Sequence, residues 1–298
     1  MSPSLLPSSG REALALEEEP ETVSEGSFSD GELRRFFEAV FERHGLDFRH
    51  YALGYLRRRV LCAMADRKCG SLTDLLDLVL AEPATLALAA LVRNLTIHTT
   101  AMFRDPGFYR ALSEHVVPVL RTYPFLRIWV AGCSTGEEAY SLAILLHEAG
   151  LYSRCRLYAT DASETVLARA RQRIFPYASM REYGENYRQA GGRADFSGYY
   201  ADDGHSAILR SFLQERIVFS QHNLVSDGSF NEFHLVLCRN VLIYFDPELQ
   251  ARAHRLMRES LVRFGFLGLG KGENPDYADR RDHYKEVAPR ERLYRKIN

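Results

Sequence analysis

The stretch from Leu126 to Leu146, LRIWVAGCSTGEEAYSLAILL, constrains the fold of this chain more than any other. It begins with a short apolar run typical of a buried strand, passes through a loop that contains Gly132 and Gly136, and ends with apolar residues at helical spacing. Glycine lets the backbone turn sharply there and lets a ligand approach it closely. Open α/β folds bind nucleotides at such a unit, at the carboxyl edge of a parallel sheet. We therefore expect a doubly wound α/β domain with a ligand site at this loop.

The residues of the loop favour a ligand without phosphate. The glycine spacing G-x-x-x-G matches neither the dinucleotide fingerprint nor the phosphate loop, and Glu137 and Glu138 stand where a phosphate-binding lysine would be needed. Two carboxylates suit the N-terminal end of a helix dipole, but they would repel a triphosphate. S-adenosylmethionine has an amino group, a sulfonium and no phosphate, so it fits. Taken alone, the loop is explained equally well by a glycine-rich turn with a solvated pair of glutamates.

Composition and charge exclude several classes of protein. With 298 residues, 46% of them hydrophobic and 26% charged, the chain has room for one large domain and one small one. A net charge of −1 gives no general attraction to nucleic acid or to a membrane, and no apolar run approaches the roughly 20 residues that span a bilayer. The five cysteines include no C-x-x-C, and the N-terminus does not resemble a secretory signal, so we expect a cytoplasmic protein with reduced thiols. The histidines have no metal-ligand spacing, which predicts no metal site.

The N-terminal third divides into a tail and a helical domain. Residues 1–28 are rich in Ser, Pro and Glu and predict a disordered acidic tail, because they cannot bury a core. Residues 29–93 predict a small all-α domain, since the capping boxes Ser29–Glu32 and Ser71–Asp74 each open a run with helical spacing.

The second predicted helix of this domain is basic and includes Arg57, Arg58 and Arg59. Such a run is often a solvated face. It also fits a docking surface for an acidic partner, and the residues themselves support both interpretations equally.

Strands and helices alternate from residue 94 to 298, with one interruption. Over about 175–215, short strands and tight turns predict a small inserted antiparallel β-subdomain with Tyr199 and Tyr200 exposed, although such tyrosines more often belong to the core of an insert than to a binding face. Asp105 precedes Pro106, which predicts a helix that begins at the proline and is capped by the aspartate. Two short runs near the end of the sequence, 284–287 and 293–297, predict a terminal hairpin.

Polar residues at three predicted strand ends suggest how a nucleoside would be held. Asp161 ends the second strand, 25 residues past Gly136, where a carboxylate can accept hydrogen bonds from both ribose hydroxyls. An acid at this position is also a common dipole partner of the next helix. Asn223 and Asn240 follow two later strands, and a carboxyamide can read the edge of an adenine.

Five segments together resemble the chemotaxis receptor methyltransferase family (CheR), the S-adenosylmethionine-dependent protein-glutamate O-methyltransferases. The resemblance covers about residues 29–298, in family order. The segments are LTIHTTAMFRDP (95–106), AGCSTGEEAYSLAI (131–144), ATDAS (159–163), HNL (222–224) and CRNVLIYFD (238–246). The resemblance implies a helical N-terminal domain, a doubly wound methyltransferase sheet and an inserted β-subdomain.

The resemblance also implies a set of site residues. Arg104 and Tyr244 are expected at the reacting centre, and the cofactor is expected to contact His98, Thr100, Ala101, Arg104, Gly132, Glu137, Asp161, Asn223, Leu224, Asn240 and Val241. Two departures from the family pattern stand out. His98 replaces the usual asparagine, which alters size and titration. Lys271-Gly272-Glu273-Asn274 replaces His-Ser-Glu-Asn, which puts the family contacts there in doubt.

The function implied by the resemblance is sensory adaptation. Glutamate side chains of methyl-accepting chemotaxis receptors would be converted to γ-methyl esters, with S-adenosylhomocysteine as the second product. The partner would be the cytoplasmic helical bundle of a receptor, met by the basic second helix and the β-subdomain, and a monomer is expected. The alternatives are a non-catalytic scaffold that binds the cofactor or its product, and a methyltransferase acting on another acidic protein.

Overall fold

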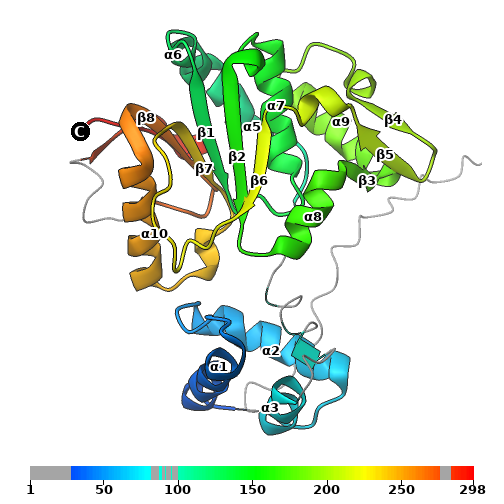
Figure 1. Cartoon of the computed structure of the whole chain (residues 1–298), viewed down its shortest axis with the longest axis vertical. Helices are drawn as coiled ribbons and strands as arrows, with labels where there is room; N and C mark the ends of the chain where they lie inside the picture. The colour runs from blue at the N-terminus through cyan, green and yellow to red at the C-terminus, as the bar shows by residue number, and fades with distance from the viewer. Residues whose placement is uncertain (1–27, 82–86, 89–90, 92–94, 96–99, 276–282) are drawn as a thin grey trace, which may run out of the picture. The chain divides into compact units, whose positions relative to one another are not determined.

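The computed structural model describes residues 28–298 apart from 82–86, 89–90, 92–94, 96–99 and 276–282 (Figure 1). The chain divides into two compact units. The first comprises residues up to 47 together with 56–95, and the second comprises 48–55 together with 96–298. The predicted tail therefore lies outside the described residues except for Phe28.

The first unit is helical, as predicted, and both capping boxes are confirmed. The Ser29 hydroxyl accepts the N–H of Glu32, and the Glu32 carboxylate accepts the N–H of Ser29. Ser71 and Asp74 make the same pair of bonds. The helices are α1 (Asp30–His44), α2 (Leu53–Arg67, whose first three residues belong to the second unit) and α3 (Leu72–Leu80). These boxes satisfy backbone donors that the first turn of a helix leaves open.

The three arginines near the start of α2 differ in their surroundings. Arg57 donates to Asp30 at 2.6 Å and lies over the ring of Phe28, 5.0 Å from its centroid. Arg58 is exposed, and Arg59 is half-buried. Arg57 therefore ties the start of the described chain to α2, and Arg58 is the member of this group that is most open to solvent.

The second unit is built on a seven-stranded sheet of described residues in the order β6-β2-β1-β7-β8-β10-β9 (Figure 1). The first five strands in that order are parallel, and the terminal hairpin of β9 and β10 is antiparallel, as predicted. The strands are β1 (Leu126–Ala131), β2 (Cys155–Asp161), β6 (Ile217–Gln221), β7 (Phe233–Cys238), β8 (Leu261–Leu269), β9 (Tyr284–Ala288) and β10 (Leu293–Lys296). The order reverses at β1, which lies between β2 and β7. Such a switch point opens a crevice at the carboxyl ends of the strands.

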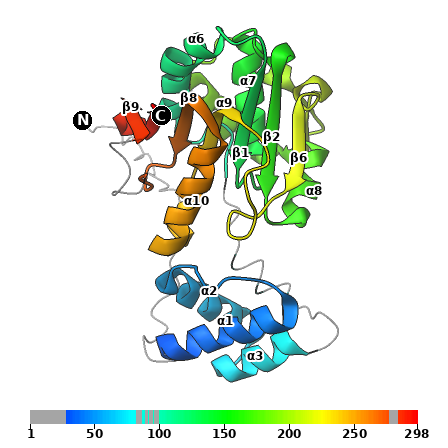
Figure 2. The same ribbon diagram turned by 60° about the vertical axis from the view of Figure 1, so that its left-hand side comes forward.

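Helices cover both faces of this sheet (Figure 2). Because successive side chains of a strand point to opposite faces, β1 reports on both layers. Ile128 and Val130 pack in the core with α5 to α8, whereas Trp129 and Ala131 pack in a second core with α10. The helical segments of this unit are α5 (Pro106–Ala111), the π-helix η1 (Leu112–Val116), α6 (Val117–Leu120), α7 (Glu137–Glu148), α8 (Glu164–Gln172), α9 (Met180–Gln189) and α10 (Pro247–Ser260), with short 3-10 turns that include η6 (Leu242–Tyr244). No described helix is both long and apolar enough to cross a membrane.

The predicted insert is a three-stranded antiparallel sheet, ordered β3-β5-β4, together with α9. Its strands are β3 (Ile174–Pro176), β4 (Tyr200–Asp202) and β5 (Ser206–Leu209). The predicted exposure of Tyr199 is wrong. Its ring packs against Phe196 and Tyr187 in the interior of the insert, and its hydroxyl donates to Glu148. A tyrosine can be buried in this way when its hydroxyl reaches a partner.

The strand, loop and helix at residues 126–146 form as predicted. Gly132 and Gly136 adopt φ values of +71° and +97°, which glycine reaches without strain. The N–H of Cys133 donates to the carbonyl of Thr160 at 2.9 Å, so the loop continues the pairing of β1 with β2. A Cβ at Gly132 would lie 2.4 Å from Cγ2 of Val241. The close approach of the Val241 side chain therefore explains why position 132 needs a glycine, without any ligand.

Substitution of Gly132 by alanine should destabilise the second unit for two separable reasons. Positive φ costs alanine roughly 1–2 kcal/mol, and overlap with Val241 costs a further 1–3 kcal/mol or so. In a Val241→Ala background only the first cost should remain. Calorimetric melting of the two single variants and the double variant measures both parts. Equal losses in the two backgrounds would contradict the packing argument.

Candidate functional site

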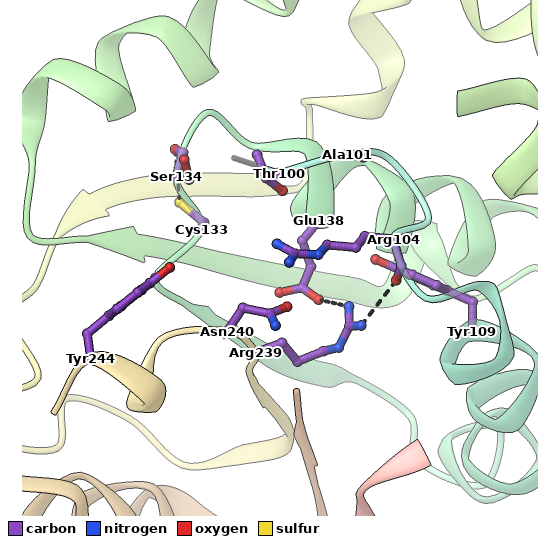
Figure 3. A pocket seen from close by; sticks show the side chains of 11 residues that line it. Thr100, Ala101, Arg104, Tyr109, Cys133, Ser134, Glu138, Arg239, Asn240 and Tyr244 are labelled. Carbon is purple, nitrogen blue, oxygen red and sulfur yellow. Dashed lines mark hydrogen bonds and ion pairs between the residues drawn. The ribbon is translucent and has the colours of Figure 1, made fainter. Parts of the chain in front are cut away.

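A pocket lies at the carboxyl edge of β1 and β7 (Figure 3). It is lined by Thr100, Ala101, Arg104, Tyr109, Gly132, Cys133, Ser134, Glu138, Arg239, Asn240 and Tyr244. The pocket brings together six of the residues predicted for the site: Thr100, Ala101, Arg104, Gly132, Asn240 and Tyr244. Others do not line it: Glu137, Asp161, Asn223, Leu224 and Val241. His98 lies outside the described residues.

Asp161 does not line this pocket itself but is hydrogen-bonded to a residue that does. Its carboxylate accepts the N–H of Ser134 at 2.9 Å through Oδ2 and the N–H of Ser163 at 3.0 Å through Oδ1. Ser134 itself lines the pocket. A carboxylate oxygen can accept two hydrogen bonds, so each oxygen of Asp161 retains capacity for a ligand hydroxyl.

Asn223 and Leu224 follow β6, the neighbour of β2. The side-chain oxygen of Asn223 accepts the N–H of Val225 at 2.9 Å, so it is used in a local turn. Leu224 is buried in the core shared with α10. The N–H of His222 donates to the carbonyl of Asp161 at 3.1 Å, which places this turn beside the end of β2.

The two glutamates of the central loop are buried, so the alternative of a solvated pair is wrong. Glu137 is 5% exposed and accepts a hydrogen bond from the hydroxyl of Thr135 at 2.7 Å. Burial raises the pKa of the Glu137 carboxyl. Glu138 is 8% exposed and faces the pocket, where its Oε1 accepts from Arg239 at 2.7 Å.

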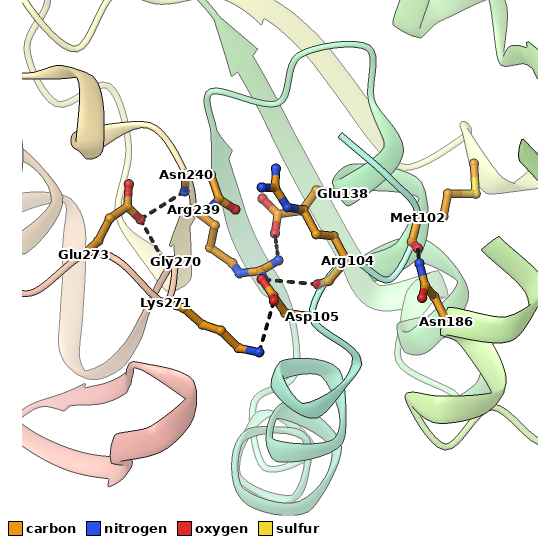
Figure 4. A network of polar contacts seen from close by, with 10 residues as sticks. All are labelled: Met102, Arg104, Asp105, Glu138, Asn186, Arg239, Asn240, Gly270, Lys271 and Glu273. Atoms are coloured by element: carbon orange, nitrogen blue, oxygen red, sulfur yellow. Dashed lines mark hydrogen bonds and ion pairs between the residues drawn. The ribbon is translucent and has the colours of Figure 1, made fainter. Parts of the chain in front are cut away.

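Arg239 connects three segments of the pocket wall (Figure 4). Its guanidinium donates to Glu138, to Asp105 at 2.8 Å and to the carbonyl of Arg104 at 3.1 Å, and it lies over the ring of Phe108 at 4.2 Å. The side chain is only 3% exposed. Burial alone would lower the pKa of Arg239, but Glu138, Tyr109 and Asp105 raise it above its usual value. We refer to Arg239 with Glu138 and Asp105 as the arginine brace.

The arginine brace holds a strained loop. Phe103 and Asp105 have φ values of +52° and +58°, in the left-handed region that non-glycine residues seldom adopt. Arg104 lies between them. The N–H of Phe103 donates to the hydroxyl of Ser141 at 2.8 Å, which fixes the other end of the loop to α7.

The predicted cap at Asp105 is wrong in its chemistry, although α5 does begin at Pro106. Asp105 occupies the N-cap position, but its side chain accepts no N–H from the helix. It pairs with Arg239, and with Lys271 at 3.2 Å. A buried guanidinium needs a counter-charge more than a short helix needs a cap, because an unpaired buried charge costs far more than a lost capping bond.

Glu273 anchors the opposite wall. Its Oε2 accepts the N–H groups of Asn240 at 3.0 Å and Gly270 at 2.6 Å, and its Oε1 accepts those of Val241 and Leu242, both at 2.7 Å. Burial raises the pKa of this carboxyl. Asn240 has a φ of +59°, so this acid stabilises a left-handed turn that places Asn240 in the pocket. The segment with the altered Lys271-Gly272 pair thus contains an acid with a clear structural role.

Tyr244 is held by residues 48–55, which belong to the same unit. Its carbonyl accepts the N–H of Ala52 at 2.9 Å, and its ring lies 4.6 Å from the ring of Tyr55. Tyr51 forms a bridge with Phe245. These contacts fix the backbone that carries the Tyr244 side chain to the rim of the pocket.

Five residues that line the pocket were not predicted from the sequence: Tyr109, Cys133, Ser134, Glu138 and Arg239. The sequence did contain a signal for two of them, Arg239 and Glu138. Arg239 directly follows the apolar strand β7, and a charge at the end of a buried strand needs a partner. Glu138, at the start of the helix after the neighbouring strand β1, is an acid of the right kind at the same sheet edge. No pattern in the sequence singled out Tyr109.

Comparison with protein families decides the assignment of the chain. Residues 98–290 match the model of the CheR methyltransferase SAM-binding domain, and residues 31–96 match that of the CheR methyltransferase all-alpha domain. The chain belongs to the CheR methyltransferase family. The predicted family and fold class are confirmed, and its cofactor is S-adenosylmethionine.

Curated relatives agree with this assignment. The chain is 44% identical to the Pseudomonas putida methyltransferase Cher3, over 90% of this chain and 97% of that protein. It is 30% identical to a chemotaxis protein methyltransferase of Listeria innocua, over 80% of this chain and 88% of the relative. It is 28% identical to a chemotaxis protein methyltransferase of Salmonella typhimurium, over 83% of this chain and 85% of the relative.

The pocket residues fit this cofactor. Two buried donors that line the pocket, the hydroxyl of Tyr109 and Nε of Arg239, have no hydrogen-bond partner within the described part of the chain. Buried donors of this kind are normally paired, so they indicate a ligand with acceptor atoms. Asp161 provides a carboxylate beside the same loop, where a sugar would need acceptors.

The buried pair of Arg239 with Glu138 should contribute far more to stability than the exposed pair of Lys271 with Asp105. Glu138→Gln removes the more deeply buried of the two carboxylate charges that compensate Arg239 and should cost about 2–4 kcal/mol. Lys271→Ala removes a cation whose side chain is 63% exposed and should cost less than about 1 kcal/mol. Calorimetric melting of both variants checks this. Similar losses for the two would show that the brace does not depend on burial.

Proposed function

We propose that this chain is a protein-glutamate O-methyltransferase that esterifies glutamate side chains of chemotaxis receptors. The observation that supports it most is that Arg104 and Tyr244 line one pocket with the Gly132–Ser134 loop, at the switch point of the sheet. The family supports the methyltransferase activity. The relatives named chemotaxis protein methyltransferase support a role in chemotaxis.

The proposed reaction does not need a general base. Bound S-adenosylmethionine supplies a methyl group on a positively charged sulfur. A glutamate oxygen forms the bond to the methyl carbon while the bond from that carbon to sulfur breaks, so that an ester and S-adenosylhomocysteine result. A glutamate is already ionised near pH 7, and no proton has to be removed.

Arg104 would orient the attacking carboxylate. A guanidinium can donate two parallel N–H groups to a carboxylate, which sets both its position and its plane. Too strong a grip would reduce the nucleophilicity of the oxygen, so the geometry of the loop that carries Arg104 is important. Tyr244, on the opposite wall in Figure 3, would close the other side of the reacting centre.

Catalysis in this proposal rests on positioning. Alignment of two bound reactants can supply on the order of 7–11 kcal/mol of barrier reduction. The arginine brace, Ser141 and Glu273 fix the loops that carry Arg104 and Asn240. Their role is to keep the pocket walls in place while both reactants bind.

The proposed partner is the helical bundle of a receptor. An acidic helix carries the glutamates that this reaction would consume. In the first unit, Arg58 is the exposed member of the predicted basic group and suits contact with such a surface, whereas Arg57 is already paired with Asp30.

Transfer of labelled methyl groups tests the proposal. Incubated with tritiated S-adenosylmethionine and receptor-containing membranes, the wild-type chain should form membrane-bound label that alkali releases as methanol. Arg104→Ala should lower this turnover by more than about 100-fold through lost orientation, whereas Arg110→Ala, on the exposed face of α5, should leave it unchanged. Absence of label with the wild-type chain would favour a scaffold, and label on soluble protein alone would favour another substrate. Retained turnover in Arg104→Ala would remove its proposed role.

The role of Asp161 in holding the cofactor is tested by binding. Asp161→Ala should weaken calorimetric binding of S-adenosylhomocysteine by more than about 100-fold, because two hydrogen bonds to a charged group are lost. Asp195→Ala is a matched control, since Asp195 also accepts the N–H two residues along, from Ser197 at 3.0 Å, but lies in the insert. Equal affinities for wild type and Asp161→Ala would refute the ribose contact.

A further inference from the structure

The hydroxyl of Tyr109 is a buried polar group that the fold does not explain. Tyr109 lies on α5 with 0% of its surface exposed, and its hydroxyl has no hydrogen-bond partner among the residues that the structure describes. A buried unpaired hydroxyl destabilises a fold, so a phenylalanine would serve the fold better. An unpaired group of this kind calls for an explanation outside the folded chain itself.

The ring of Tyr109, by contrast, is well accounted for. It packs edge to face with Phe108, with centroids 5.7 Å apart, and at 5.0 Å from the ring of Phe103. The guanidinium carbon of Arg239 lies 5.8 Å from the ring centroid. These contacts need an aromatic ring, and none of them uses the oxygen.

The hydroxyl faces the pocket. Tyr109 lines the same pocket as Arg104 and Glu138, and Figure 3 shows its phenol extending from α5 toward those two side chains. Burial raises the pKa of Tyr109, so the group stays a protonated donor at neutral pH. The hydroxyl of Ser141 is close to Tyr109, but it donates its proton to the carbonyl of Glu137 and accepts from the N–H of Phe103, so that proton is not available to the Tyr109 oxygen.

The chemistry around Tyr109 selects an anionic acceptor. Among the described residues that line the pocket, Glu138 is the single acid, and its charge is compensated by Arg239. The Nε of Arg239 is a second buried donor without a partner in the described chain. Two donors, one of them on a cationic group, match the two oxygens of a carboxylate.

We propose that Tyr109 is a ligand-binding residue whose hydroxyl donates a hydrogen bond to a carboxylate in this pocket. The inference rests on the proposed function, because that reaction brings two carboxylates here. One is the side chain of the accepting glutamate, and the other is the amino-acid end of the methyl donor, which S-adenosylhomocysteine retains. Both are the same ligand chemistry, and binding experiments distinguish them.

The test uses the full chain as wild type, Tyr109→Phe and Tyr284→Phe. Phenylalanine keeps the ring contacts of Tyr109 and removes only the oxygen. Tyr284 is the matched control, because its hydroxyl is also buried without a partner in the described chain but lies in the core beneath α10, away from the pocket. Each protein is titrated calorimetrically with S-adenosylhomocysteine and with 5′-methylthioadenosine, which lacks the amino-acid carboxylate, and is assayed for methyl transfer to receptor-containing membranes.

A tenfold to hundredfold effect or so is expected from loss of one hydrogen bond to a charged group. Weaker binding of S-adenosylhomocysteine by Tyr109→Phe, with unchanged binding of 5′-methylthioadenosine, identifies the carboxylate of the donor. Unchanged binding of both nucleosides with a lower kcat/KM for methyl transfer identifies the carboxylate of the accepting glutamate. The melting temperature of Tyr109→Phe should be equal to that of the wild type or higher, and Tyr284→Phe should match the wild type in binding and turnover.

Three results would overturn the inference. The first is wild-type affinity and turnover in Tyr109→Phe. The second is an equal loss of affinity for both nucleosides, which indicates general damage to the pocket, and the third is an equal effect of Tyr284→Phe. If the wild-type chain itself transfers no methyl group, the proposed function has failed, and the two nucleoside titrations alone decide on Tyr109.

Discussion

The site depends on one buried cation. The guanidinium of Arg239 is almost fully removed from water and is stable there only because Glu138 and Asp105 face it from two other segments. Its position therefore joins the end of β7, the start of α7 and the loop before α5. Removing Glu138 or Asp105 would leave the buried guanidinium with one carboxylate in place of two. The pocket walls are in this way coupled to one another more tightly than hydrophobic packing would require.

This coupling explains why strained backbone gathers around the pocket. Phe103, Asp105, Ser134 and Asn240 all have positive φ without being glycine. Such conformations cost about 1–3 kcal/mol each and persist only where surrounding contacts fix them. Here those contacts are identifiable: Ser141 for Phe103, Arg239 for Asp105, Asp161 for Ser134, and Glu273 for Asn240. The strain is therefore balanced by charged or hydroxyl groups that reach the loop backbone.

Local rules predicted the elements well and the polar interior poorly. The capping boxes at Ser29 and Ser71 and the loop at Gly132 follow from short-range backbone chemistry, which a sequence displays directly. Asp105 and Glu138 were misjudged because their partner Arg239 is more than 100 residues away in the chain. The burial of Tyr199 likewise depends on Glu148, which belongs to a helix outside the insert. Long-range charge pairing is invisible to periodicity, although motif resemblance located the same region.

The arrangement of charges also separates holding the pocket from reading its ligand. Glu138, Arg239, Asp105 and Lys271 alternate in sign, and as two acids and two bases they sum to no net charge. Such a chain fixes geometry without adding a net field to the pocket, because each charge is screened by its neighbour. Recognition of the ligand is then left to hydrogen-bonding groups that take no part in these ion pairs. A hydroxyl such as that of Tyr109 can contribute there without disturbing the charges that keep Arg104 in place.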